Sequence, residues 1–396
     1  MRLPLRPLPF LAGLVLLAAC QDPAGVGLGL IDEEGADPTV RTLLATSVDT
    51  ALVERTLIGF ADSNATPAQT RVLAGDVADP VFGDARVTGY VDLIQPTIPG
   101  DTEAENVLAA QLEVQRTYVY GDTTASISLA LRQVDVDAGP WSPDPTYPPD
   151  TLFAVGPVLT TSTVSVADEI VTFDLPESWV EANAATLVGD TFNEDFEGFA
   201  LEPTRTGGVG AVFGFQAQTT QTRLRVFTTT DTLSYRLGEV FSSVQRTAPA
   251  ALPPGVSPAQ VSSGVVVAAR FPLDTVGPLP VARAVFRAPL DLSFQQDGTF
   301  VRPIAERALL YGVEGDGTRT LIATVVVEGS VASTSLTNTL TPVLQDVVVG
   351  DRAFAQFELE PSGVPASLDI LPVAFDLSVP GGALAGPTLS LTVVGT

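Results

Sequence analysis

The sequence contains no histidine and no lysine, so all 20 of its basic residues are arginines. The absence of histidine excludes Ser-His-Asp triads, Cys-His pairs and His-ligated metal sites. The absence of lysine excludes Schiff-base catalysis and the lysine of a phosphate-binding P-loop. Carboxylates, hydroxyls, tyrosines and arginines therefore remain as the groups available for chemistry.

The chain also has a single cysteine, Cys20, which excludes an internal disulfide. It follows a basic start, Arg2 and Arg6, and an apolar stretch over residues 8–18 that is too short to span a bilayer. This pattern, ending in Leu-Ala-Ala-Cys, resembles the bacterial lipoprotein signal. The resemblance implies that residues 1–19 are a signal peptide removed before Cys20, which then carries lipid on its sulfur and its new amino terminus.

Several acyl chains on Cys20 would anchor the exported protein durably without a transmembrane helix. No later apolar run is long enough to span a bilayer as a helix. Gln21 follows the cysteine in place of the aspartate associated with inner-membrane retention in enteric bacteria. By that analogy we expect an outer-membrane lipoprotein of the cell envelope, facing either the periplasm or the outside.

The charge balance is strongly negative, at −26 for the whole chain. Removing Arg2 and Arg6 from the 20 basic residues leaves 18 against 46 acidic ones, a balance of −28. Such a surface repels phosphates, so we expect no nucleic-acid partner. It suits calcium, a cationic partner or a salty medium. The exclusive use of arginine fits a GC-rich genome equally well.

Alternating apolar and polar residues at intervals of 8 to 20 residues predict an all-β protein. The segments are 42–50, 86–94, 107–120, 126–136, 169–176, 196–203, 210–218, 222–230, 262–273, 282–292, 307–315, 321–329, 345–361, 370–379 and 388–395. A short helix is expected at SWVEANA (178–184) and a hairpin turn at EGDG (314–317).

The fold expected from this pattern is two antiparallel β-sandwich domains of jelly-roll-like topology in series. Residues 20–38 form a Gly- and acid-rich stretch without periodicity, which predicts a flexible tether. The Pro- and Ala-rich stretch 247–260 is the expected linker or long loop. These boundaries place the first sandwich at 39–246 and the second at 261–396.

The two halves show similar strands in a similar order. VLAAQLEV, LALRQV, VTFDLP, FEGFALEP and LRVFTT of the first half align with ARAVFRAPL, ALLYGVEG, FAQFELEP, LPVAFDL and LSLTVV of the second. The spacings differ by several residues, and alternating strands resemble one another by chance. An internal duplication and a chance likeness both remain open on the sequence.

Several segments resemble a group of lipoproteins best known from Bacteroidota. They are Cys20 with its GVGLGL follow-on, residues 73–93 with their Asp-Pro-x-Phe-Gly motif, residues 196–203, and residues 282–313. The resemblance implies an exported, lipid-anchored β protein and brings no established activity.

Two loops carry the oxygen ligands that calcium prefers. The residues are Asp76, Asp79 and Asp84 in GDVADPVFGD, and Asp190, Asn193 and Asp195 in GDTFNED. Neither loop has the spacing of an EF-hand, and Asp-Pro and Gly-Asp are also ordinary turn formers. Calcium is the only cofactor that the sequence indicates.

Paired carboxylates are the machinery of glycoside hydrolysis. Glu194, Asp195 and Glu197 at a strand entrance are the first such group to consider, with surface solubility as the alternative role. Trp141 and Tyr147, on a Pro-rich loop, are candidates for sugar stacking. We expect Trp179 to pack the short helix onto a sheet, and Arg302 to form a buried or half-buried ion pair.

From these features we expect a lipid-anchored envelope protein that binds or scaffolds a polysaccharide or a protein partner without catalysis. A carboxylate-dependent hydrolase of surface glycans is the alternative. A cleft lined by two close acids with raised pKa values would favour the enzyme. A purely structural lipoprotein without a small ligand is the third possibility.

Overall fold

The computed structural model describes most of the chain outside the amino-terminal segment. The described residues are 38–52, 55–56, 71–100, 102–135, 146–147, 150–205, 207–217, 219–247, 256–260, 265–290, 296–334, 339–362, 372–376 and 386–394. The predicted signal peptide over residues 1–19, Cys20 and Trp141 lie outside these residues.

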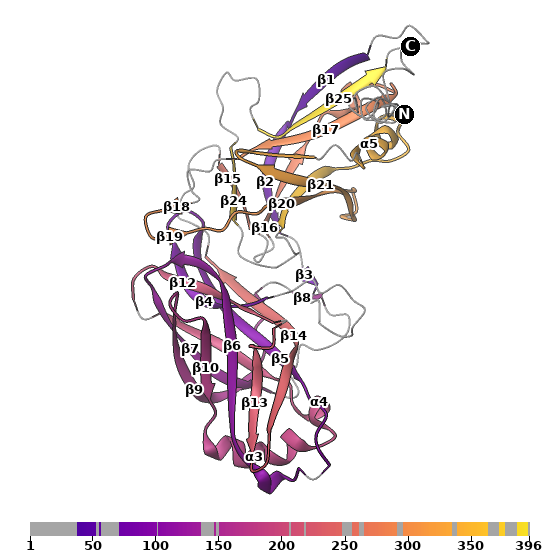
Figure 1. Ribbon diagram of the computed structural model, residues 1–396. Helices are drawn as coiled ribbons and strands as arrows, with labels where there is room; N and C mark the ends of the chain where they lie inside the picture. Colours follow the sequence, from indigo (N-terminus) through magenta and orange to yellow (C-terminus); the bar gives the residue numbers. More distant parts are fainter. Residues whose placement is uncertain are drawn as a thin grey trace, which may run out of the picture.

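The fold is all-β and sandwich-like, with two large antiparallel sheets, as the alternating segments predicted (Figure 1). We call the first the N-terminal sheet. It contains β4 (Arg71–Asp79), β5 (Gly83–Ile94), β6 (Val107–Asp122), β7 (Ser126–Val134), β9 (Val155–Ser165), β10 (Ile170–Asp174), β11 (Phe199–Arg205), β12 (Gly210–Gln216), β13 (Arg223–Thr228), β14 (Thr232–Arg246), β18 (Gln296–Asp297) and β19 (Phe300–Val301).

The second, the C-terminal sheet, also includes two strands from the start of the described chain. It contains β1 (Pro38–Leu44), β2 (Ser47–Leu52), β15 (Val256–Gln260), β16 (Val265–Arg270), β17 (Val281–Pro289), β20 (Arg307–Val313), β21 (Arg319–Glu328), β22 (Val331–Thr334), β23 (Gln356–Ser362), β24 (Pro372–Asp376) and β25 (Thr388–Val394). A separate short pair joins β3 (Arg55–Thr56) to β8 (Thr146–Tyr147).

Period-two alternation explains why these segments form strands with one face in a core. In β7, Ile127, Leu129 and Leu131 are buried while the residues between them face outward. Each sheet encloses its own apolar core, rich in phenylalanine, valine and leucine. Burial of these apolar faces is the main favourable contribution to folding.

The N-terminal sheet curls back on itself through β14. The first part of this long strand pairs with β13 and its second part pairs with β5. The change of partner coincides with a register break between Leu237 and Val240. Because β13 and β5 lie far apart in the strand order, the strand closes the sheet around its core.

The C-terminal sheet closes in the same manner, but with strands from the beginning of the chain. β1 pairs with β25, and β2 pairs with β16. The predicted boundary placed residues 39–52 with the first sandwich, whereas these pairings join them to the C-terminal sheet. Within the predicted linker 247–260, residues 256–260 form β15, which pairs with β24. Such long-range pairings leave no local signal in the sequence.

The two sheets share one topology. β7 pairs with β9 and β11, as β20 pairs with β21 and β23. β6 lies between β10 and β13, as β17 lies between β22 and β25. β4 joins β5 to β12, as β15 joins β16 to β24. β1 and β2 together therefore occupy the position of β14.

The correspondence extends to the residue register. Phe199-Ala-Leu-Glu-Pro of β11 and Phe357-Glu-Leu-Glu-Pro of β23 both follow a helix. Leu201 lies opposite Leu131, and Leu359 lies opposite Leu310. This agreement favours the internal duplication over a chance likeness, the two possibilities that the sequence left open. It changes two alignments, because FEGFALEP matches FAQFELEP rather than LPVAFDL, and VTFDLP of β10 takes the position of β22 rather than that of FAQFELEP.

The expected helix is present as α3 (Glu177–Val188), and two more helices are α4 (Phe192–Asp195) and α5 (Leu340–Val349). Trp179 of α3 is buried against Phe196 and Phe199, as predicted. The expected strand 345–361 was wrong in its first part, where α5 ends at Gly350 with φ +87°. A valine-rich run this short does not distinguish a helix from a strand.

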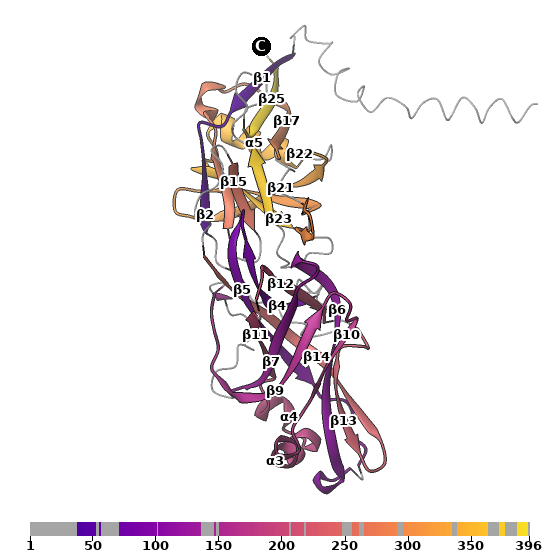
Figure 2. The same cartoon turned by 90° about the vertical axis from the view of Figure 1, so that its left-hand side faces the viewer.

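The sheets lie at opposite ends of an elongated molecule (Figures 1 and 2). Pro38 of β1 pairs with Val394 of β25, so both ends of the described chain lie together at the end formed by the C-terminal sheet. Helix α3 lies at the opposite end. Among the described residues, no helix has the length and apolar character needed to cross a membrane.

Candidate functional site

The Asp-Pro-Val-Phe-Gly motif forms the turn between β4 and β5. The Asp79 carboxylate accepts hydrogen bonds from the backbone N–H groups of Val81 (2.7 Å) and Phe82 (3.0 Å). Gly83 follows with φ +87°, a conformation that glycine adopts without strain. An aspartate that bonds the next two backbone N–H groups is a standard turn former. The Asp-Pro-Val-Phe-Gly motif is therefore explained by the turn that it forms between β4 and β5.

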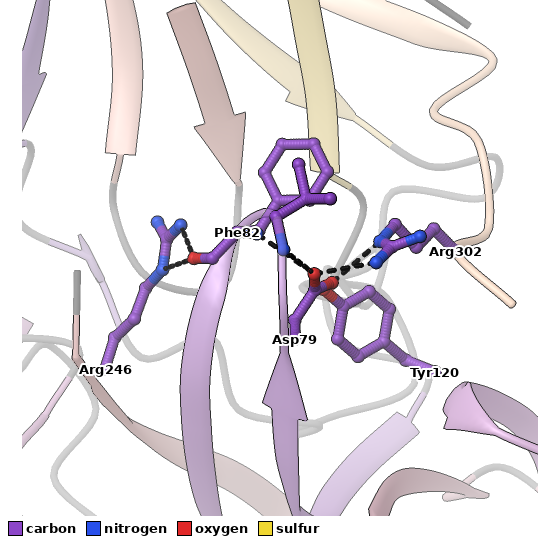
Figure 3. Close-up of polar contacts among 6 residues, drawn as sticks. Asp79, Phe82, Tyr120, Arg246 and Arg302 are labelled. Carbon is purple, nitrogen blue, oxygen red and sulfur yellow. Dashed lines mark hydrogen bonds and ion pairs between the residues drawn. The ribbon is translucent and has the colours of Figure 1, made fainter. Parts of the chain in front are cut away.

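Asp79 also holds the two halves of the chain together. Its carboxylate accepts hydrogen bonds from Arg302, with Nε to Oδ2 and Nη2 to Oδ1 both at 2.8 Å (Figure 3). The Tyr120 hydroxyl donates to Oδ2 as well. Both side chains of the ion pair are buried, at 1% and 0% exposure. The predicted ion pair of Arg302 is therefore confirmed, and it is bidentate.

Arg302 reaches Asp79 because its segment leaves the C-terminal sheet. After β17 the chain forms the β18–β19 hairpin, in which Phe300 pairs with Asp122 at the end of β6. The Phe300 ring stands edge-on to Tyr120, with ring centroids 5.8 Å apart, and the Arg302 guanidinium lies 4.2 Å from the Phe300 centroid. The chain then returns to the C-terminal sheet at β20.

Charge pairing sets the protonation states at this junction. Burial alone raises the pKa of Asp79, but the bonds from Arg302, Tyr120 and the turn outweigh it and lower that pKa. Burial, together with the Asp79 charge, raises the pKa of Tyr120 well above its ordinary value. Arg246 donates to the Phe82 carbonyl on the other side of the turn. At this junction the charges of Asp79 and Arg302 neutralise each other, and the pair has a structural role.

In the first predicted calcium loop the acidic side chains are bonded within the protein or exposed, and calcium at this loop stays a prediction. The oxygens of Asp79 are bonded as described, and Asp76 forms an ion pair with Arg205 at 3.4 Å. Asp84 is exposed, and its backbone carbonyl accepts a hydrogen bond from the Thr247 N–H. The Asp-Pro and Gly-Asp pairs act here as turn formers.

The second predicted loop is exposed around α4. Asp195 accepts a hydrogen bond from the Thr191 hydroxyl at 2.6 Å, and Asn193 accepts one from the Gln95 backbone N–H at 3.4 Å. Asp190 lies just before α4 and is exposed. Across the described ranges, no three acidic or cysteine side chains are grouped to hold a metal ion. Calcium at this loop stays a prediction.

Three carboxylates gather instead where β14 changes partner. Burial raises the pKa of Asp92 to about 7, and the charges of Glu239 and Glu197 add to that rise. Burial also raises the pKa values of Glu197 and Glu239. Of the acids first considered for hydrolysis, Glu197 belongs to this group, while Glu194 and Asp195 are exposed on α4.

Two glycines allow the chain segments that contain Glu197 and Glu239 to pack closely against β5 beside Asp92. Gly198, next to Glu197, has φ +85°, and a Cβ there would lie 2.0 Å from the Val91 carbonyl oxygen. A Cβ on Gly238, next to Glu239, would lie 3.0 Å from the Asp92 Oδ2 atom. Sequence reasoning missed Asp92 and Glu239 because only the β5–β14 pairing brings them together. Glu197 in the Phe-Glu-Gly motif was the one member of this acidic group that the sequence analysis singled out.

The remaining predicted site residues are Tyr147, Trp141 and Cys20, and the structure describes only the first of them. Tyr147 belongs to β8 and pairs with Arg55 of β3. Trp141 and Cys20 lie outside the described residues, so their predicted roles in sugar contact and lipidation stay predictions. No protein-family model, curated protein or solved structure matches the chain.

Proposed function

We propose that this chain is an outer-membrane lipoprotein, anchored through lipid on Cys20, that binds or scaffolds an envelope polysaccharide or protein without catalysis. The likeness to Bacteroidota lipoproteins is part of this proposal. Its main structural support is the position of β1, the first described strand after Cys20. β1 is built into the C-terminal sheet, beside β25 and at the far end from α3.

In this arrangement, an anchor at Cys20 would determine which end of the molecule lies near the membrane. A lipid on Cys20 would hold the C-terminal sheet near the bilayer and present the N-terminal sheet farther away. Exposed acids occupy that far end, on α3, on α4 and on the loop with η2 (Ala104–Asn106), and they favour a cationic partner there. They are Glu103, Glu105, Glu177, Glu181, Asp190, Glu194 and Asp195.

A glycan hydrolase is the second candidate, and one observation favours it. Asp92, with its pKa raised to about 7, lies beside two other acids, as a general acid would. Against it stand the absence of histidine and lysine and the position of the acids at a strand pairing that closes the sheet.

Incubation of the purified protein with envelope polysaccharides separates these functions. We expect retention of the protein on a polysaccharide or protein ligand and no release of reducing ends. Release of reducing ends that Asp92→Asn abolishes, with Asp174→Asn as the control at an exposed carboxylate, would show the hydrolase. Failure to bind any envelope fraction would contradict the binding proposal.

A further inference from the structure

A small hollow lies on the outer face of the C-terminal sheet. Its volume is about 220 Å³, and the lining residues are Arg287, Pro289, Val331, Ser333, Gly386 and Thr388. Phe286 and Ala288 on the same strand are buried in the core, so Arg287 faces outward. Cross-strand pairing places Arg287 opposite Ser333 of β22 on one side and Thr388 of β25 on the other.

Because the two sheets share one topology, the residue of the N-terminal sheet that corresponds to Arg287 can be identified. Glu113 of β6 lies opposite Thr172 of β10 and Arg223 of β13, so it corresponds to Arg287. The Glu113 carboxylate accepts hydrogen bonds from Arg223 at 3.0 Å and Arg225 at 3.1 Å. In the N-terminal sheet the site therefore contains its own carboxylate and the arginines that bind it.

In the C-terminal sheet the charges are rearranged. An arginine replaces the glutamate, Thr388 replaces Arg223, and Ser390 takes the position of Arg225. Arg287 is exposed, and none of the described carboxylates forms an ion pair with it. Arg283 and Arg307 are likewise exposed and form no ion pair with a described carboxylate, so the hollow is what distinguishes Arg287.

We propose that this hollow binds an acidic sugar, with Arg287 donating to the sugar carboxylate. A guanidinium matches a carboxylate with two parallel hydrogen bonds. The half-buried Ser333 hydroxyl bonds a sugar hydroxyl, and Pro289 and Val331 contact the apolar edge of the ring. The volume holds about one sugar unit, below the roughly 300 Å³ or more of typical ligand pockets. The inference rests on the proposed polysaccharide binding and names its ligand class.

Saturation-transfer NMR of the full chain in detergent, titrated with glucuronate and separately with glucose, tests this site. We expect glucuronate to bind with a Kd near 1 mM, glucose to bind at least tenfold more weakly, and Arg287→Gln to weaken glucuronate binding at least tenfold. Arg283→Gln changes an exposed arginine of the same strand outside the hollow and should leave the Kd unchanged.

Equal glucuronate binding by Arg287→Gln and the unchanged protein would overturn the site, as would no binding by the unchanged protein at 10 mM glucuronate, roughly ten times the expected Kd. These results differ from failure of the proposed function. A protein that still binds envelope polysaccharide after Arg287→Gln would keep that function and lose only this site. An unchanged melting temperature confirms that the variant is folded.

Discussion

At the scale of single residues, the most consequential contact joins Asp79 to Arg302 across 223 positions of sequence. Both side chains are buried, and each satisfies the charge of the other. Removing one member of such a pair leaves an uncompensated charge in a low-dielectric interior, which costs more than the intact pair contributes. The ion pair therefore fixes how the β18–β19 hairpin docks on the N-terminal sheet.

Arg302→Met tests this role. We expect it to lower the free energy of unfolding by about 3 to 5 kcal/mol, because Asp79 remains buried without its cation. Arg307→Met removes an exposed arginine a few residues later and should change stability by less than about 0.5 kcal/mol. Urea denaturation measures both. Equal effects of the two substitutions would contradict a structural role for the ion pair.

Asp92 makes the stability of the protein depend on pH, because burial raises its pKa, whereas the bonds of Asp79 lower the pKa of that residue. Its folded pKa is raised from 3.8 to about 7, so between these values the folded state holds more protons than the unfolded state. Its contribution to stability is full below about pH 4 and is lost as the pH rises through about 7. Asp92→Asn removes the buried charge while keeping the shape.

We expect Asp92→Asn to stabilise the protein by up to about 4 kcal/mol at pH 8, the free-energy equivalent of a pKa raised from 3.8 to about 7. The difference from the unchanged protein should shrink toward zero at pH 4. Denaturation curves at the two pH values measure it. A stabilisation that is the same at both pH values would show that ionisation of Asp92 is not its source.

At the scale of elements, β1 and β2 differ from the strand they correspond to. β14 buries Leu233, Tyr235, Leu237 and Val240, whereas β1 buries only Leu43. The C-terminal sheet is therefore closed mainly by the backbone pairing of β1 with β25 and of β2 with β16. A strand with so few buried side chains is expected to open more readily than the rest of the sheet.

Leu43→Ala tests the closing strand against a matched neighbour. Truncating this buried side chain should cost about 2 to 3 kcal/mol, while Leu44→Ala, at a side chain 49% exposed, should cost less than about 0.5 kcal/mol. Amide hydrogen exchange should rise in β25 and β16 of the Leu43 variant and stay unchanged in β5 and β13. Faster exchange in both sheets alike would contradict a local role.

The elements also show what the sequence predicts and what it does not. Alternation in segments such as 126–134 is local, so the strands and the all-β class were predictable. The helix at 178–184 was predictable as well. The closure by residues 38–52, the Asp79–Arg302 pair and the Asp92 cluster all depend on pairings between distant segments. In a single sequence such pairings have no periodic signal, so the partners of Asp79 were not predictable.

At the scale of the whole molecule, one topology occurs twice, and the segment nearest Cys20 completes the second copy. In the proposed function, a load on the lipid anchor would pass through β1 into the C-terminal sheet. The N-terminal sheet would follow through the buried Asp79–Arg302 contact. The chain would thus act as a two-part spacer that presents a polar, acidic end away from the bilayer.

The most direct test of this account is labelling of cells with radioactive palmitate, followed by fractionation of the unchanged protein and of Cys20→Ala. We expect label on the unchanged protein and its recovery in the outer-membrane fraction. The variant should carry no label and should leave that fraction. A Cys20→Ala protein that stays in the outer membrane, together with an unlabelled parent, would contradict the lipid anchor.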